Sequence, residues 1–228
     1  MRSRVVSALY LAATAVAAML GLSDMASTQQ PALGRQMLEA ATRGDVTAVR
    51  KLIAAGAPLD PVDAGKRTPL LIAVERDELE TATLLIEAGA NINAQAANLD
   101  TPWLLAGARG RAEMLRLMIA KKPDLSLRNR FGGNALIPAC ERGLVEAVEV
   151  LLTTSIDVNH INNLGWTCLL EIVILGDGGP RHVEVAKLVL AAGANPNIAD
   201  KDGVSPLTHA KRKRQHDVAV LIEAAGGR

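Results

Sequence analysis

The chain of 228 residues is 49% hydrophobic and 21% charged, and its formal net charge at pH 7 is +1. This length and balance fit one or two folded domains, and they exclude a disordered chain or a strongly basic nucleic-acid-binding protein. One Phe, one Tyr, two Trp and two Cys are too few for a base-stacking platform, a disulfide-framed small domain or a Cys-rich zinc module.

The first segment has the pattern of an export signal. Two arginines within residues 1–4 precede an apolar run over 5–22, and small residues near Ser23 suit a cleavage site. We predict a signal peptide over 1–23 and a flexible leader over 24–32, which places the mature protein in the periplasm or outside the cell. The alternative is an uncleaved membrane anchor, because an apolar run of this length could just span a bilayer.

From residue 33 onward, the sequence repeats with a period of 33 residues. Similar triplets, of which Thr-Pro-Leu is the clearest, begin at Thr68, Thr101, Asn134, Thr167 and, after an insertion over 176–180, at Ser205. Thr or Ser can cap a helix N-terminus, and Pro is tolerated at the next position. Each copy predicts a short helix, a turn such as Arg109-Gly110, and a longer amphipathic helix that ends at a glycine. One helix pair cannot bury its own apolar faces, so the copies must stack.

This pattern resembles the ankyrin repeat, whose Thr-Pro-Leu phrase and 33-residue period the chain reproduces. The resemblance implies that residues 33–228 form an all-α solenoid of helix-turn-helix units with β-hairpin-like fingers, and with the signal pattern we expect an exported bacterial ankyrin-repeat protein. The implied units are an N-terminal cap over 33–65, repeats over 66–98, 99–131, 132–164 and 165–202, and a C-terminal cap over 203–228. No copy has the family's His after Leu, so we expect apolar packing to replace its hydrogen bond.

The resemblance also implies that the fingers and short helices form a concave surface that binds other proteins. One set of candidate binding residues consists of arginines that recur every 33 residues at the ends of the short helices, namely Arg43, Arg76, Arg109 and Arg142. These arginines could form charge-assisted pairs with an acidic partner. Alternatively, they are solvated residues that simply precede a turn.

A second candidate set consists of large apolar residues at positions on or near the predicted fingers and short-helix ends: Phe131, Ile161, Leu164, Trp166, Ile174 and Leu175. Exposed groups of this kind are typical of interaction hot spots. The alternative is that the insertion over 176–180 folds back and buries them. Trp103, by contrast, replaces a buried Leu and is predicted to lie in the core.

The sequence contains no converging catalytic triad and no glycine-rich phosphate loop, so we expect no enzyme activity and no cofactor. The four histidines form no ligand motif, and we predict scattered surface histidines rather than a metal site. Cys140 and Cys168 lie at different heights on the predicted short helices of successive repeats. A disulfide needs Cα atoms within about 7 Å, so we expect two free, buried thiols.

Together, these observations predict a monomeric, exported module that binds a partner protein through its concave face. Nucleic acid is not an expected partner, and contact with a membrane is expected only through an uncleaved N-terminal segment. The alternative functions are a membrane-tethered structural or protective scaffold and a secreted effector that acts on host proteins.

Overall fold

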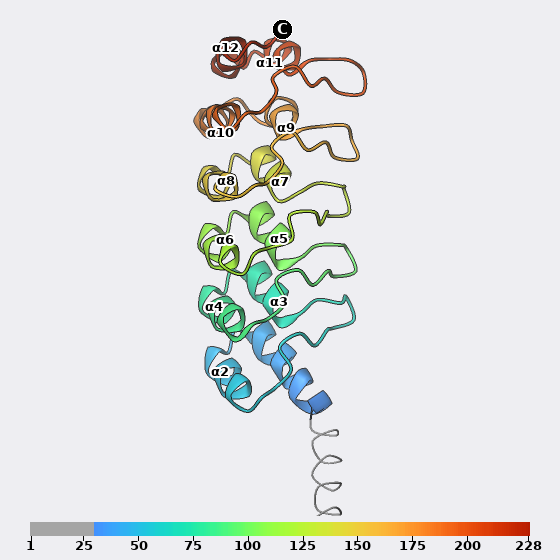
Figure 1. Ribbon diagram of the computed structural model, residues 1–228, viewed down its shortest axis with the longest axis vertical. Coiled ribbons are helices and arrows are strands. Elements are labelled where there is room, and N and C mark those ends of the chain that lie inside the picture. The colour runs from blue at the N-terminus through green and yellow to red at the C-terminus, as the bar shows by residue number, and fades with distance from the viewer. Residues whose placement is uncertain (1–29) are drawn as a thin grey trace, which may run out of the picture.

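The computed structural model describes residues 30–228, so the predicted signal peptide and residues 24–29 of the predicted leader lie outside the described part. Within that part, six helix pairs stack in one column (Figure 1). The inner layer contains the helix over 30–43, α3 (Pro69–Arg76), α5 (Pro102–Arg109), α7 (Leu136–Glu141), α9 (Cys168–Ile174) and α11 (Pro206–Arg212). The outer layer contains α2 (Val46–Ala54), α4 (Leu79–Ala88), α6 (Ala112–Ile119), α8 (Val145–Leu152), α10 (Pro180–Ala191) and α12 (His216–Ala224).

The loops that join each outer helix to the next inner helix project to one side of the column as fingers (Figure 1). Each finger is named after the inner helix that follows it, so the α3, α5, α7, α9 and α11 fingers cover residues 55–68, 89–101, 120–135, 153–167 and 192–205. None of the residues from 30 to 228 is in a β-strand. The predicted all-α solenoid is therefore confirmed, and its fingers are built from turns. Residues 30–32 are already helical, although we expected them in the leader.

The predicted capping residues begin most of the inner helices. The side chains of Thr68, Thr101, Thr167 and Ser205 each accept a hydrogen bond from the backbone N–H three residues later. In α7, where Asn134 replaces Thr, the Asn134 Oδ1 accepts from the N–H groups of Leu136 and Ile137. Its amide also donates to the Asp157 carbonyl, 2.9 Å away. Pro138 therefore falls in the first turn, where its missing N–H is tolerated.

One continuous apolar core runs through all of the helix pairs, from Met37 to Ile222. Trp103 is among its largest fully buried side chains, as predicted. The apolar residues at the position of the missing His, such as Leu71 and Leu170, are also buried. Because each helix pair contributes one layer to this core, neighbouring repeats stabilise one another through apolar burial.

A ladder of side-chain to backbone hydrogen bonds joins the finger bases of neighbouring repeats. In each rung, an Asp or Asn oxygen accepts the N–H of a residue in the next repeat. The rungs are Asp60 to Asn91, Asn93 to Asp124, Asn159 to Asn195 and Asn197 to Arg228, with lengths of 2.9, 3.0, 2.7 and 3.0 Å. Ser126 occupies the corresponding position between the α7 and α9 fingers. Its shorter side chain bonds to Asp124 instead, so this rung is missing.

Restoring the missing rung should stabilise the protein. In the Ser126→Asn variant, the new side-chain oxygen is expected to accept the N–H of Asp157. This should raise the free energy of unfolding by about 1 kcal/mol, the usual net value of one hydrogen bond. That gain corresponds to a rise in Tm of about 2–4 °C for a chain of this size, measured by circular dichroism. The reciprocal control is Asn93→Ser, which removes an existing rung and should lower Tm by a similar amount. An unchanged Tm in Ser126→Asn beside a lowered Tm in Asn93→Ser would contradict this account of the ladder.

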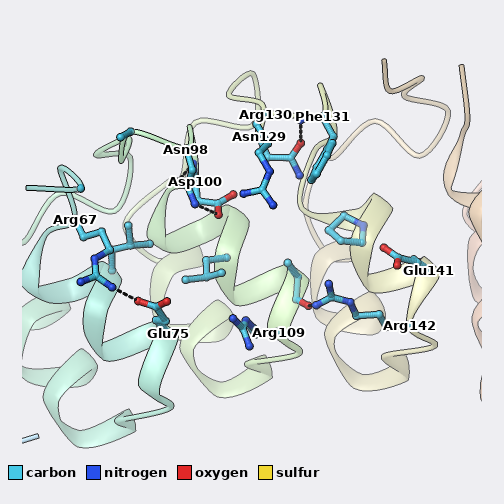
Figure 2. Close-up of a pocket in the computed structure, with 16 residues that line it drawn as sticks. Arg67, Glu75, Asn98, Asp100, Arg109, Asn129, Arg130, Phe131, Glu141 and Arg142 are labelled. Atoms are coloured by element: carbon cyan, nitrogen blue, oxygen red, sulfur yellow. Dashed lines mark hydrogen bonds and ion pairs between the residues drawn. The ribbon is translucent and has the colours of Figure 1, made fainter. Parts of the chain in front are cut away.

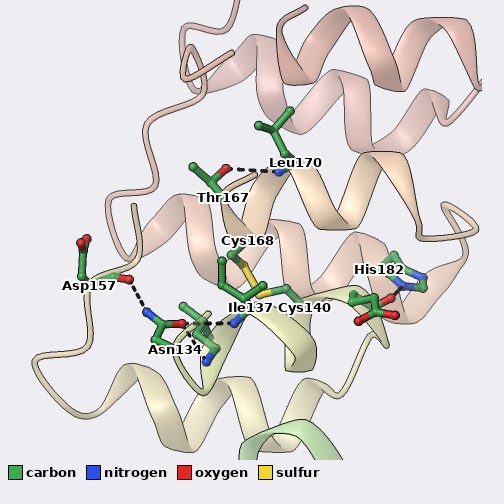
Figure 3. The surroundings of a disulfide bond; sticks show 10 residues. Asn134, Ile137, Cys140, Asp157, Thr167, Cys168, Leu170 and His182 are labelled. Atoms are coloured by element: carbon green, nitrogen blue, oxygen red, sulfur yellow. Dashed lines mark hydrogen bonds between the residues drawn. A yellow bond between two sulfur atoms is a disulfide. The ribbon is translucent and has the colours of Figure 1, made fainter. Parts of the chain in front are cut away.

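Cys140 and Cys168 form a disulfide bond, so the expectation of two separated thiols is wrong (Figure 3). Their Cα atoms are 5.5 Å apart. Cys140 lies near the end of α7, whereas Cys168 is the first residue of α9. The bond therefore joins the inner helices of two consecutive repeats.

The reason for this close approach is an offset between consecutive inner helices. The sixth residue after the cap position of one repeat lies against the first residue after the cap position of the next. One repeat earlier, Gly107 and Ala135 form the same pair, and a Cβ atom on Gly107 would lie 2.6 Å from the Ala135 carbonyl oxygen. Residues at different heights along their own helices therefore come into contact. The expectation of two separated thiols assumed that consecutive inner helices are level with each other.

Candidate binding groove

A groove of about 730 Å³ lies between the fingers and the inner helices of the central repeats (Figure 2). Its floor is formed by Leu71, Leu105, Ala108 and Pro138, which come from α3, α5 and α7. Its sides carry charged and aromatic groups from the α3, α5 and α7 fingers and from the ends of the inner helices. We call this feature the central groove.

The fingers along the groove are held by a recurring turn. In four fingers, one side-chain oxygen accepts the backbone N–H groups two and four residues later. The accepting residues are Asp63, Asn129, Asn162 and Asp200. Ala96 occupies this position in the α5 finger and has no side-chain acceptor. Because these short polar side chains close the turns, the finger tips have defined positions along most of the stack.

Backbone hydrogen bonds also join neighbouring finger tips in two places, between the α3 and α5 fingers and between the α7 and α9 fingers. The Ala97 N–H donates to the Gly65 carbonyl, and the Asn163 N–H donates to the Phe131 carbonyl, each at 2.9 Å. The equivalent bond between the α5 and α7 fingers would join Arg130 and Asn98, and it is not formed among the described residues. The central groove thus coincides with an interruption in the backbone contacts between fingers.

Four guanidinium groups line the groove, and one of them is neutralised. Arg67 forms ion pairs with Asp63 and Glu75, each at 2.8 Å. Arg142 donates to the Ala108 carbonyl at 2.6 Å, and the guanidinium of Arg130 lies 4.6 Å from the ring centre of Phe131. The ion pairs recorded within residues 30–228 involve neither these two arginines nor Arg109.

Two further carboxylates line the groove. Asp100 accepts a hydrogen bond from the Asn98 side chain at 2.8 Å, and burial raises the pKa of Asp100 although Arg130 and Arg109 act in the opposite direction. Glu141 lies beside Arg142 at the end of α7. The groove therefore combines three arginines that are free of ion pairs with two carboxylates.

The structure divides the four predicted arginines into two pairs. Arg109 and Arg142 line the central groove, as Figure 2 shows. Arg76 and Arg43 do not line it, and each lies 3.9 Å from a nearby glutamate on the surface. Exposed pairs at this distance contribute little to stability.

The predicted apolar set is also divided. Phe131, Ile161, Leu164 and Leu175 remain exposed, with exposed fractions of 54, 50, 51 and 51%. Trp166 and Ile174 are partly buried and pack against the core. The insertion over 176–180 therefore does not bury Leu175. Instead, the Gly176 carbonyl accepts hydrogen bonds from the side chains of Lys213 and Gln215 in the next repeat.

Sequence reasoning missed several residues of the groove, including Arg67, Asp100 and Arg130. Arg130 directly precedes Phe131, and Asp100 directly precedes the cap Thr101. Their places next to two residues that the repeat pattern singled out are the signal that could have found them.

His182 is buried, so the expectation of surface histidines is wrong for this residue. Its Nδ1 lies 2.7 Å from the Asp177 carboxylate, and its Nε2 lies 3.0 Å from the Glu141 carbonyl. These two contacts fix the orientation of the ring between the insertion and the end of α7. A backbone bond from Gly179, followed by the bond from His182, lowers the pKa of Asp177. The insertion is thus tied to α7.

Glu171 on α9 is a further buried ionisable group that the sequence did not single out. Its exposed fraction is 4%, and its Oε1 accepts a hydrogen bond from Asn162 at 2.8 Å, whereas Oε2 has no partner among the described residues. Burial, reinforced by the nearby Glu141 carboxylate, raises the pKa of Glu171 to about 7. No group of three or more His, Cys, Asp or Glu residues within 30–228 is placed to hold a metal ion. No helix of this part is long and apolar enough to cross a membrane.

Comparisons with known proteins agree with this architecture. A family model described as ankyrin repeats in three copies matches residues 7–96 and 103–200. The putative ankyrin repeat protein YahD of Escherichia coli (strain K12) is 42% identical over 65 residues. That match covers 28% of this chain and 32% of YahD, so the chain spans about a third of this relative's length.

Solved structures of the same class are similar over most of the chain. An ankyrin repeat domain from Acinetobacter baumannii is 42% identical, with a TM-score of 0.81, over 84% of this chain and 98% of that one. The ankyrin repeat protein EF0377 is 37% identical, with a TM-score of 0.81, over 83% and 97% of the two chains. The ankyrin repeat domain of Bcl-3, an IκB family member, is 25% identical, with a TM-score of 0.74, over 85% and 86%.

Proposed function

Because the chain belongs to the ankyrin-repeat family, we propose that it is an exported module that binds a partner protein through the concave face formed by its fingers and inner helices. Repeats of this family are generally protein-interaction modules. The observation that carries the proposal is the exposure of two large apolar side chains on adjacent fingers, Phe131, which lines the central groove, and Leu164. Large apolar groups that stay exposed in a folded protein are typical of interaction sites.

Two observations support export. The segment over 1–23 has the sequence pattern of a signal peptide. The disulfide between Cys140 and Cys168 is typical of proteins that fold in an oxidising compartment, because thiols in the cytosol are kept reduced. The two features lie far apart in the sequence and support the proposed export independently.

Site-specific photo-crosslinking tests the proposal. A photoreactive amino acid is placed at Leu164 in the full chain, and crosslinked products are sought in the exported fraction of the native host. The matched control places the same group at Leu79, which is also exposed but lies at the start of the outer helix α4. We expect a distinct crosslinked protein from Leu164 and none from Leu79. The same products from both positions, or products from neither, would contradict binding through the concave face.

A further inference from the structure

Resting on the proposed function, we infer that the central groove selects an extended acidic segment of the partner, with two carboxylates that pair with Arg109 and Arg142 and a large apolar side chain that packs on Phe131 and Leu164. The inference depends on three features of the groove: its size, its charge and its interrupted backbone contacts.

The size and shape of the groove suit a short stretch of polypeptide. Its volume of about 730 Å³ lies within the range of ligand sites, roughly 300–1,000 Å³. The small and apolar residues of its floor, Ala108 and Pro138 among them, allow a peptide backbone to approach closely. Asn98, Arg130 and Phe131 of the fingers border the groove opposite Arg109 and Arg142 of the inner helices (Figure 2).

Charge favours an acidic occupant. Arg109, Arg130 and Arg142 form no recorded ion pairs within residues 30–228, and Arg142 is fixed in place by its bond to the Ala108 carbonyl. Arginine presents two parallel donors that match a carboxylate, and a fixed guanidinium loses less freedom when the pair forms. The groove's own carboxylates offset only part of this charge, because Asp100 interacts with Arg130 and Arg109 at longer range but forms no ion pair with either within residues 30–228.

The interrupted backbone contact favours an extended occupant. The Arg130 N–H and the Asn98 carbonyl have no recorded hydrogen-bond partners among the described residues, although the equivalent groups of two other finger pairs bond to each other. An extended segment between the α5 and α7 fingers could bond to both groups, as peptides do when they add to a strand edge. Phe131 then lies next along the groove, and Leu164 follows on the adjoining finger.

A displayed library of random twelve-residue peptides, selected on the full chain, tests this inference. We expect the enriched peptides to share two Asp or Glu residues and one large apolar residue. The dissociation constant of an enriched peptide is then measured by fluorescence anisotropy. It should rise at least tenfold in Arg109→Gln plus Arg142→Gln, and equally when the peptide's own acidic residues are changed to Gln. The control Arg212→Gln, on the exposed end of α11, should change it less than twofold.

The possible outcomes separate this inference from the proposed function. Enriched peptides that are neutral or basic, but that lose binding when Phe131 and Leu164 are changed to Ser, would overturn the acidic occupant and leave concave-face binding intact. Enriched peptides that bind every groove variant equally would overturn both. A library that yields no enriched peptide would overturn a linear segment as the occupant, while the crosslinking experiment would still report on a folded partner. Circular dichroism melts identify any variant that fails to fold.

Discussion

Removing the disulfide between Cys140 and Cys168 is expected to lower the free energy of unfolding by about 3–4 kcal/mol, because the unfolded chain regains the entropy of a loop that the bond had closed. The bonded residues are 28 positions apart in the sequence, which places the expected loss in this range. The change is made either with a reductant or as Cys140→Ala plus Cys168→Ala. Equilibrium denaturation followed by far-UV circular dichroism measures the loss.

The loss of stability should also be localised within the stack of repeats. In a stack of repeats, each unit is stabilised mainly by its neighbours, so the loss should be largest around α7 and α9. Hydrogen exchange should therefore accelerate in these helices and less in α3 and α5. The control is reductant added to the Cys140→Ala plus Cys168→Ala variant, which should have no further effect. A loss below about 1 kcal/mol would contradict this account, because it would mean that the reduced, unfolded chain is nearly as restricted as the cross-linked one.

The solenoid could be predicted from the sequence because its determinants are local and repeat. The Thr101 cap, the turn at Gly110 and the glycine stop at Gly89 each act within one helix or turn, and the structure confirms them. Gly110 has a φ of 70°, a left-handed conformation that glycine adopts without strain. The period of 33 residues then orders these local units into a stack.

The features that were not predicted depend on contacts between repeats. Cys140 and Cys168 meet because consecutive inner helices are offset, and that offset is a property of the packing rather than of either helix. His182 is buried because the insertion turns toward α7, which brings the ring within hydrogen-bond distance of the Glu141 carbonyl. Likewise, Arg109 lines the groove whereas Arg76 does not, although both occupy the same position in their repeats. The 33-residue period makes such positions equivalent in the sequence, but the contacts between fingers give them different surroundings.

The second large effect is expected at Glu171. Glu171→Gln should raise the free energy of unfolding by about 2–3 kcal/mol at pH 8 and leave it nearly unchanged at pH 4.5. In the folded protein the pKa of Glu171 is about 7, above the value of 4.5 for an unperturbed glutamate, because the carboxyl is buried beside Glu141. The folded state therefore binds more protons than the unfolded state between these two values. Wild-type stability should fall from pH 4.5 to pH 7 for this reason, whereas Gln remains neutral throughout.

The pH dependence of the difference between the two proteins is the measurement that decides this prediction. Urea denaturation at several pH values should give a difference in the free energy of unfolding that grows from pH 4.5 to about pH 8 and then levels off, since the carboxylate is then ionised in both states. The matched control is Glu149→Gln on the exposed face of α8, for which we expect no difference that changes with pH in this way. Glu141→Gln removes the nearby charge and should recover only part of the gain, because burial is the larger cause of the raised pKa of Glu171. If Glu171→Gln changed the free energy of unfolding by the same amount at pH 4.5 and pH 8, the prediction would be wrong. Glu171 would then be a carboxylate of unperturbed pKa that is stabilised by its bond to Asn162.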